Sequence, residues 1–177
     1  MEKGPTHVEI TVVMRWFVPG FLFAFSLQVL ALEPKDVLSA QIALEGAPPQ
    51  AGQSATVIVR LSIRNEWHIN SAKPLQTYLI PTSLAMTPSS GIALGEVLYP
   101  EGVLRRFPFA TEELSVYEGL VELRAPLTAP RKPGKYPLTF KLRYQACDQR
   151  TCLPPTTLDT SFEFEVLAST TPKPPRP

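Results

Sequence analysis

Apolar and polar residues alternate along most of the chain between Asp36 and Leu167, which is the pattern of β-strands with one buried face. The alternation is clearest in YPLTFKLRYQAC (136–147), where the apolar face takes the even positions. SATVIVRLSIR (54–64) and SFEFEV (161–166) alternate in the same way. Further strands are predicted at 37–44, 83–88, 92–99 and 115–127.

Segments with turn chemistry separate these runs, as in APPQAGQ (47–53) and APRKPGK (129–135). No stretch longer than about ten residues combines helical spacing with a cap. About seven to nine short strands, each with one apolar face, must cover those faces against one another. The sequence therefore predicts an all-β fold over 32–167, an immunoglobulin-like antiparallel two-sheet sandwich.

The two ends of the chain are predicted to lie outside this domain. Residues 1–31 are interpreted as a signal peptide, with Met14 as the expected true start, Arg15 as its basic residue and cleavage after Ala31. An uncleaved membrane anchor is the alternative, although Pro19 interrupts the apolar run. The Pro-rich segment 168–177 is predicted to be a disordered tail or the start of a linker.

Charge and motifs exclude several function classes. Lys and Arg number 17 against 16 for Asp and Glu, so nothing favours a nucleic-acid partner. No Gly-rich phosphate loop or Ser/His/Asp arrangement is present, and we expect no cofactor. His68 is the only histidine after the leader, and a zinc site needs three or four ligands, so no metal is expected.

Cys147 and Cys152 are the only cysteines, and export would place them where thiols pair. Strand parity predicts Cys147 on the outer face with Arg143. A bridge closing so short a loop stabilises by only about 2 kcal/mol, against roughly 4 for one joining distant strands. Arg150 in the loop would favour a departing thiolate, whereas Asp148 opposes this. These residues leave open whether the bridge is structural or redox-active.

The hairpin YQACDQRTCLPP (144–155) resembles the active-site hairpin of the DsbD N-terminal domain family. WHINSAKPLQTYLIPTSL (67–84) and YPEGVLRRFPFATEELSVYEG (99–119) are similar to other stretches of that family. The resemblance covers roughly 36–167. It departs from the best-known members in having four rather than five residues between the cysteines.

This resemblance implies a periplasmic immunoglobulin-like domain that relays electrons by thiol–disulfide exchange. Cys152 would form the mixed disulfide with a partner and Cys147 would resolve it. The implied partners are thioredoxin-fold proteins of the disulfide-isomerase or cytochrome c maturation type. The membrane and thioredoxin-like domains of the full-length family protein are not in this sequence, so the resemblance implies a membrane electron donor on another chain. An aromatic cap loop would shield the cysteines, with Phe107 or Phe109 of FPFATEE (107–113) as its lid.

Other residues near the motifs have two interpretations each. His68 would assist proton transfer as a base or be hydrogen-bonded for structure at a strand end, the second being favoured, and Trp67 belongs to the same local cluster. Tyr144 is expected to pack beneath the hairpin. The alternative function for the whole chain is a redox-inert exported binding module, with Cys147–Cys152 as a passive clip. The enzyme class that the resemblance favours is a thiol:disulfide oxidoreductase of the protein-disulfide reductase type.

Overall fold

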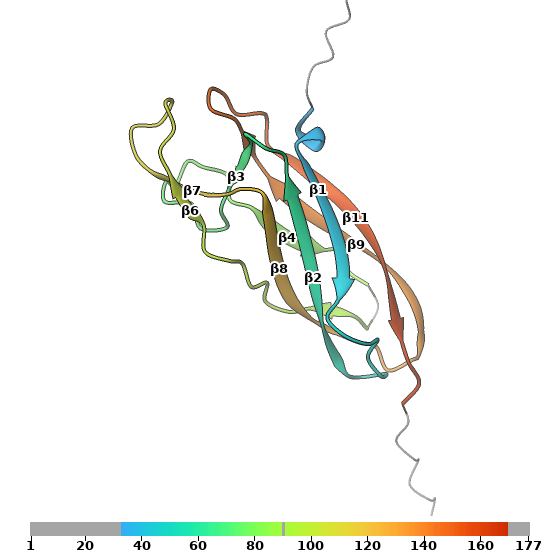
Figure 1. The fold of residues 1–177 in the computed structure, drawn as a ribbon. Coiled ribbons are helices and arrows are strands. Elements are labelled where there is room, and N and C mark those ends of the chain that lie inside the picture. The colour runs from blue at the N-terminus through green and yellow to red at the C-terminus, as the bar shows by residue number, and fades with distance from the viewer. Residues whose placement is uncertain (1–32, 90, 170–177) are drawn as a thin grey trace, which may run out of the picture. The chain divides into compact units, whose positions relative to one another are not determined.

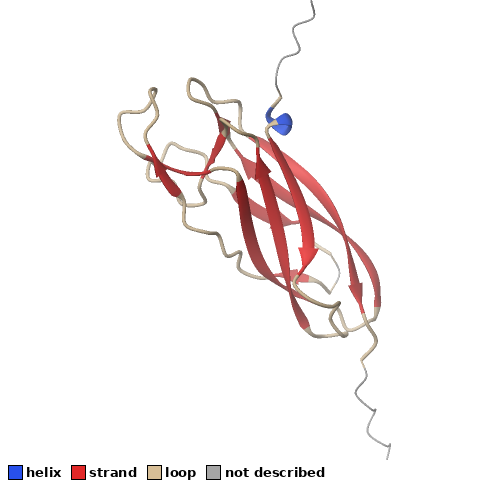
Figure 2. Ribbon diagram, viewed as in Figure 1, coloured by secondary structure: helices blue, strands red, loops and turns tan. Residues whose placement is uncertain are grey.

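The computed structural model describes residues 33–89 and 91–169. The predicted signal peptide and all but the first two residues of the predicted tail lie outside the described residues. After a short 3₁₀ helix (Pro34–Asp36), the chain is built of antiparallel strands (Figures 1 and 2). These strands are β1 (Leu38–Leu44), β2 (Ser54–Ile63), β3 (His68–Asn70), β4 (Ser83–Met86), β5 (Ala93–Leu94), β6 (Val103–Arg105), β7 (Leu114–Tyr117), β8 (Leu120–Thr128), β9 (Gly134–Tyr144), β10 (Ala146–Cys147) and β11 (Thr156–Val166).

Hydrogen bonding groups the strands into three sheets, ordered β1-β2-β8-β5, β11-β9-β4 and β10-β3-β7-β6. The main core contains the buried apolar side chains of the first two sheets, among them Leu61 of β2, Leu123 of β8 and Phe140 of β9. The predicted all-β immunoglobulin-like sandwich is confirmed. Within the described residues, no helix has the length and apolar character needed to cross a bilayer.

The predicted alternation holds where a strand stays in one sheet. In β9 every second side chain from Leu138 to Tyr144 is buried, while Lys141 and Arg143 are exposed. β11 pairs with β9 along its whole length, from Thr156 opposite Tyr144 to Val166 opposite Gly134. The apolar face of this hairpin therefore covers the core without a register change.

The chain passes from one sheet to another at three short breaks. Residues 64–67 separate β2 from β3, residues 118–119 separate β7 from β8, and Gln145 separates β9 from β10. Two of these breaks use left-handed backbone, at Glu66 (φ 67°) and Gly119 (φ 61°). All three connect the sheet β10-β3-β7-β6 to the rest of the sandwich.

Three local predictions were wrong. Cys147 is not exposed like Arg143: Ala146 keeps the inward parity of β9 and belongs to the main core, but the opposite face of β10, where Cys147 pairs with His68, is buried as well. The strand predicted at 115–127 is divided between β7 and β8. The strand predicted at 92–99 is regular only at Ala93–Leu94, after which single bonds such as Leu98 to Arg124 follow β8.

Candidate active site

The Cys147–Cys152 disulfide closes the hairpin loop that follows β10. The Asp148 N–H donates to the Thr151 carbonyl (2.9 Å), and the Leu153 N–H donates to the Ala146 carbonyl (2.8 Å). Oδ1 of Asp148 accepts the backbone N–H groups of Arg150 and Thr151, both at 2.7 Å. These hydrogen bonds hold the pKa of Asp148 below its usual value, because they favour the carboxylate. Asp148 thus orders the loop as an Asx turn.

The two cysteines differ in accessibility. Cys147 is 2% exposed, whereas Cys152 is exposed. Cys147 lies in the ladder of β10 against β3, with His68 as its directly opposite residue. Cys152 lies beyond the loop, where Pro154 and Pro155 follow and no ladder continues. An attacking thiolate therefore reaches the sulfur of Cys152 more easily than that of Cys147.

His68 is buried beside Cys147 at 1% exposure. Its ring stacks on Phe107 with centroids 4.0 Å apart and planes 18° apart. Its Nε2 atom has no hydrogen-bond partner among the described residues, so the favoured expectation of a hydrogen-bonded structural histidine does not hold for that atom. Burial lowers the pKa of His68 to about 4, although the negative charges of Glu118 and Asp148 act in the opposite direction.

The loop between β6 and β7 carries both phenylalanines predicted for the cap. Phe107 is 5% exposed and packs in a separate small cluster with Leu114 and Val116. Phe109 is 42% exposed and stacks on Phe107, with centroids 5.4 Å apart. The loop thus places an inner, buried ring and an outer, half-exposed ring over His68, while Cys152 remains exposed with the loop in this position.

Polar contacts hold this loop to its surroundings. Arg105 pairs with Glu118 at 3.0 Å, and Arg106 lies 3.8 Å from Glu113. The Gln76 side chain donates to the Glu112 carboxylate at 3.2 Å and to the Glu113 carbonyl at 3.0 Å. Exposed pairs of this kind stabilise by only about 1 kcal/mol or less each. These polar contacts therefore contribute little to the free energy that holds the loop in place.

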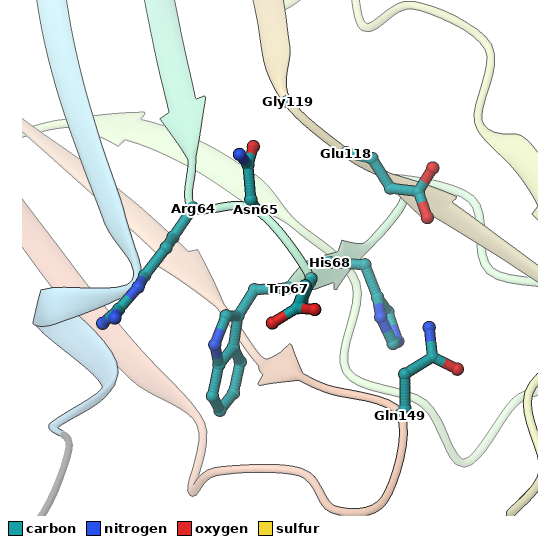
Figure 3. Close-up of a pocket in the computed structure, with 8 residues that line it drawn as sticks. Arg64, Asn65, Trp67, His68, Glu118, Gly119 and Gln149 are labelled. Atoms are coloured by element: carbon teal, nitrogen blue, oxygen red, sulfur yellow. The ribbon is translucent and has the colours of Figure 1, made fainter.

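A cleft of about 290 Å³ opens next to His68, at the sheet-to-sheet breaks (Figure 3). His68 and Gln149 approach each other across it, and Trp67 lies on the other side of the β2–β3 turn from His68. The lining residues come from the break between β2 and β3 with the start of β3, from the break between β7 and β8, and from the hairpin loop: Arg64, Asn65, Glu66, Trp67, His68, Glu118, Gly119 and Gln149. Within the described parts of the chain, no three His, Cys, Asp or Glu side chains are grouped to hold a metal ion.

The remaining predicted site residues divide into structural and exposed groups. Tyr144 is fully buried in the main core and donates its hydroxyl hydrogen to the Pro34 carbonyl at 2.9 Å. Trp67 is half-buried against the main core and lines the cleft. Arg150 is exposed in the hairpin loop, and its charge helps to lower the pKa of Asp148.

The family model of the N-terminal domain of the thiol:disulfide interchange protein DsbD matches residues 35–163. The chain belongs to this family. Membership of the DsbD N-terminal domain family, together with the disulfide, assigns the chain to thiol–disulfide exchange at the level of the family.

Several solved structures resemble this DsbD N-terminal domain. The N-terminal periplasmic domain of ScsB from Proteus mirabilis is 12% identical, with a TM-score of 0.52 over 77% of this chain and 49% of that one. The reduced DsbD N-terminal domain of Neisseria meningitidis is 21% identical, with a TM-score of 0.47 over 76% and 89%. The same domain in complex with the PilB N-terminal domain is 19% identical, with a TM-score of 0.45 over 78% and 94%. No curated protein matches the chain.

The cleft residues that the sequence did not indicate are Arg64, Asn65, Glu66, Glu118, Gly119 and Gln149. Glu118 and Glu66 belong to sheet-to-sheet breaks, which carry no periodic signal. The available clue was the turn chemistry at Glu118–Gly119, where the alternation of 115–127 is interrupted. Gln149 lies between the cysteines, and nothing in its residue type distinguishes it.

Proposed function

We propose that this chain is a periplasmic thiol–disulfide exchange protein that relays reducing equivalents between thioredoxin-fold partners through Cys147 and Cys152. The observation that carries the proposal is the unequal exposure of the two cysteines, with Cys152 exposed and Cys147 at 2%. Exchange needs one sulfur that a partner can reach and a second that can displace it. A passive clip has no need for such a difference.

The relay proceeds through a mixed disulfide. A thiolate of the donor attacks Cys152, the Cys147–Cys152 bond breaks, and Cys147 leaves with the electron pair. The donor's second thiol then displaces Cys152, so that the donor becomes a disulfide and this chain becomes a dithiol. With an acceptor the steps reverse: Cys152 attacks the acceptor disulfide, and Cys147 closes onto Cys152 and releases the acceptor as a dithiol.

We assign the cap role to the loop between β6 and β7. Phe107 covers His68, which is the register partner of Cys147, and Phe109 stacks outside it. The cap therefore shields the resolving cysteine more than the attacked one. The exposed ion pairs of the loop contribute little, so a docking partner that displaces it must chiefly offset the exposure of Phe107, roughly 1.5–3 kcal/mol.

A trapping experiment tests the relay. In the Cys147→Ser variant, Cys152 cannot be released by an internal thiol, so mixed disulfides with thioredoxin-fold proteins should accumulate in a periplasmic extract. The matched Cys152→Ser variant should trap far less, because its remaining thiol is buried. Equal trapping by both variants, or none by either, would refute the assignment of roles.

The redox-inert alternative is separated by the reduction potential. Inert structural bridges have potentials below about −300 mV. A relay requires a potential above that value, measured by equilibration of the wild-type protein with glutathione buffers. A potential below it would favour the passive clip.

A further inference from the structure

His68 lies where its ring can serve Cys147. The two residues are directly opposite in the antiparallel β3–β10 pair, so their side chains leave the same face of the sheet with Cβ atoms about 4.5–5.5 Å apart. Phe107 stacks on the histidine ring at 4.0 Å. The imidazole therefore has the Phe107 ring against one face and Cys147 as its neighbour on the sheet.

The buried Nε2 atom of His68 is costly if the residue only fills space. A buried polar atom that has lost its water and gained no hydrogen-bond partner destabilises the folded state. A phenylalanine at this position would keep the ring stack with Phe107 without that cost. An unpartnered nitrogen is useful, however, if it receives a proton in a state in which the disulfide is open.

The closing step of the proposed relay creates that need. Once the disulfide is open, Cys147 is a thiol with little access to water, since the residue is 2% exposed. Only the thiolate attacks a disulfide, and burial disfavours the charged form of any group. A base within the protein would remove the proton without admitting solvent.

We propose that His68 is the proton acceptor for Cys147 in the closing step, an inference that rests on the proposed relay. The thiol hydrogen of Cys147 passes to Nε2 of His68, and the resulting thiolate attacks the sulfur of Cys152 in the mixed disulfide. The Cys147–Cys152 bond forms and the bond from Cys152 to the partner breaks. The electron pair leaves on the partner's sulfur, and the imidazolium returns its proton to that thiolate or to solvent.

The charges around His68 suit a base that is protonated only briefly. Burial lowers its pKa to about 4 while the disulfide is closed, so the ring is neutral at rest. Glu118 and Asp148 favour the protonated ring, and a thiolate at Cys147 would add a third negative charge. Arg64, Glu66 and Glu118 line the cleft with His68, and the charges of Glu118 and Asp148 act on its ring. Arg105 pairs with Glu118, and Arg150 lies beside Asp148 in the hairpin loop.

The closing step can be measured without a protein partner. Reduced protein is mixed with dithiobis(nitrobenzoate), which releases one coloured thiolate when Cys152 attacks and a second when Cys147 closes the disulfide. In His68→Phe the first release should keep its wild-type rate, and the second should slow by about 100-fold, as expected for loss of a general base. His68→Gln, which keeps a hydrogen-bonding group but is not a base, should be equally slow.

The pH profile gives the sharper readout. Internal proton transfer makes the closing rate of the wild-type protein nearly constant between about pH 5 and 7, because the total number of bound protons does not change. In both variants the rate should instead rise about tenfold per pH unit, since hydroxide must then remove the proton. Circular dichroism of each variant checks that the fold is kept.

A wild-type closing rate in His68→Phe would overturn the proposal, and so would a wild-type rate in His68→Gln, which would indicate a hydrogen-bonding role alone. If neither variant folds, a tenfold rise per pH unit in the wild-type protein overturns it by itself. Failure of the relay is a separate result: the trap with Cys147→Ser would capture no thioredoxin-fold protein, while the dependence of ring closure on His68 would persist.

Discussion

Substitution of Phe107 by leucine should expose Cys147 without exposing Cys152 further. Phe107 is 5% exposed, packs on Leu114 and Val116, and stacks on His68. Leucine keeps most of the apolar packing but removes the ring stack, which is worth about 0.5–1.5 kcal/mol. With the change of shape, the covered state should lose roughly 1–2 kcal/mol, which raises the uncovered population about 5- to 30-fold.

The assay is alkylation of single-cysteine proteins by iodoacetamide, followed by mass spectrometry. Cys147, studied in the Cys152→Ser background, should react about 5- to 30-fold faster when Phe107→Leu is added. Cys152, studied in the Cys147→Ser background, should react at an unchanged rate. Leu120→Ala provides the matched control, because Leu120 is 85% exposed and belongs to neither aromatic stack.

Two results would refute this reasoning. An unchanged rate at Cys147 would mean that Phe107 does not cover the resolving cysteine. An equal acceleration at both cysteines would mean that the substitution loosens the whole domain rather than the cap.

Three further predictions concern stability. Folding lowers the pKa of His68 from 6.5 to about 4, so in this pH range the unfolded chain binds a proton that the folded chain does not. The free energy of unfolding should therefore fall by up to about 3 kcal/mol as the pH is lowered from 6.5 to 4. Urea denaturation of His68→Phe should lack this loss. Asp148→Ala removes the acceptor of two backbone N–H groups and should speed amide exchange in residues 150–151. The wild-type loop should loosen similarly once pH falls below the lowered pKa of Asp148. Equal protection of the loop in the variant and the wild type would contradict the Asx turn. Tyr144→Phe removes the hydrogen bond to Pro34 and should cost about 1 kcal/mol in urea denaturation while leaving disulfide exchange unchanged, and altered exchange would show that Tyr144 does more than pack.

The sequence predicted the sandwich because period-two patterns report which side of a strand is buried. β9 and β11 follow the pattern throughout, since each stays in one sheet along its length. The exposure of Cys147 was predicted wrongly because the face of β10 opposite Ala146, which holds Cys147 beside His68, is buried too. Periodicity reports which face of a strand meets the main core, but not whether another segment covers the opposite face.

The candidate site is built where several segments that are distant in the sequence meet. The cysteines themselves were identified from composition and motif, and the two phenylalanines from the resemblance. The alignment of His68 with Cys147, in contrast, depends on the pairing of β3 with β10, two strands that lie far apart in the sequence and share no local signal. Glu118 reaches the same cleft from a third segment.

The packing of the sheet β10-β3-β7-β6 also indicates which part of the domain unfolds first. The sheet β10-β3-β7-β6 has its own small apolar cluster of Phe107, Leu114 and Val116, separate from the main core. Ile69, Tyr117 and Ala146 of this sheet belong to the main core, whereas the edge strand β6 has no buried side chain. A segment with few buried contacts can unfold locally at a free energy below that of global unfolding. We therefore expect the amides of β6 and of the loop that follows it to exchange with deuterium earlier than those of β2 and β9, so that this edge yields while the scaffold stays intact.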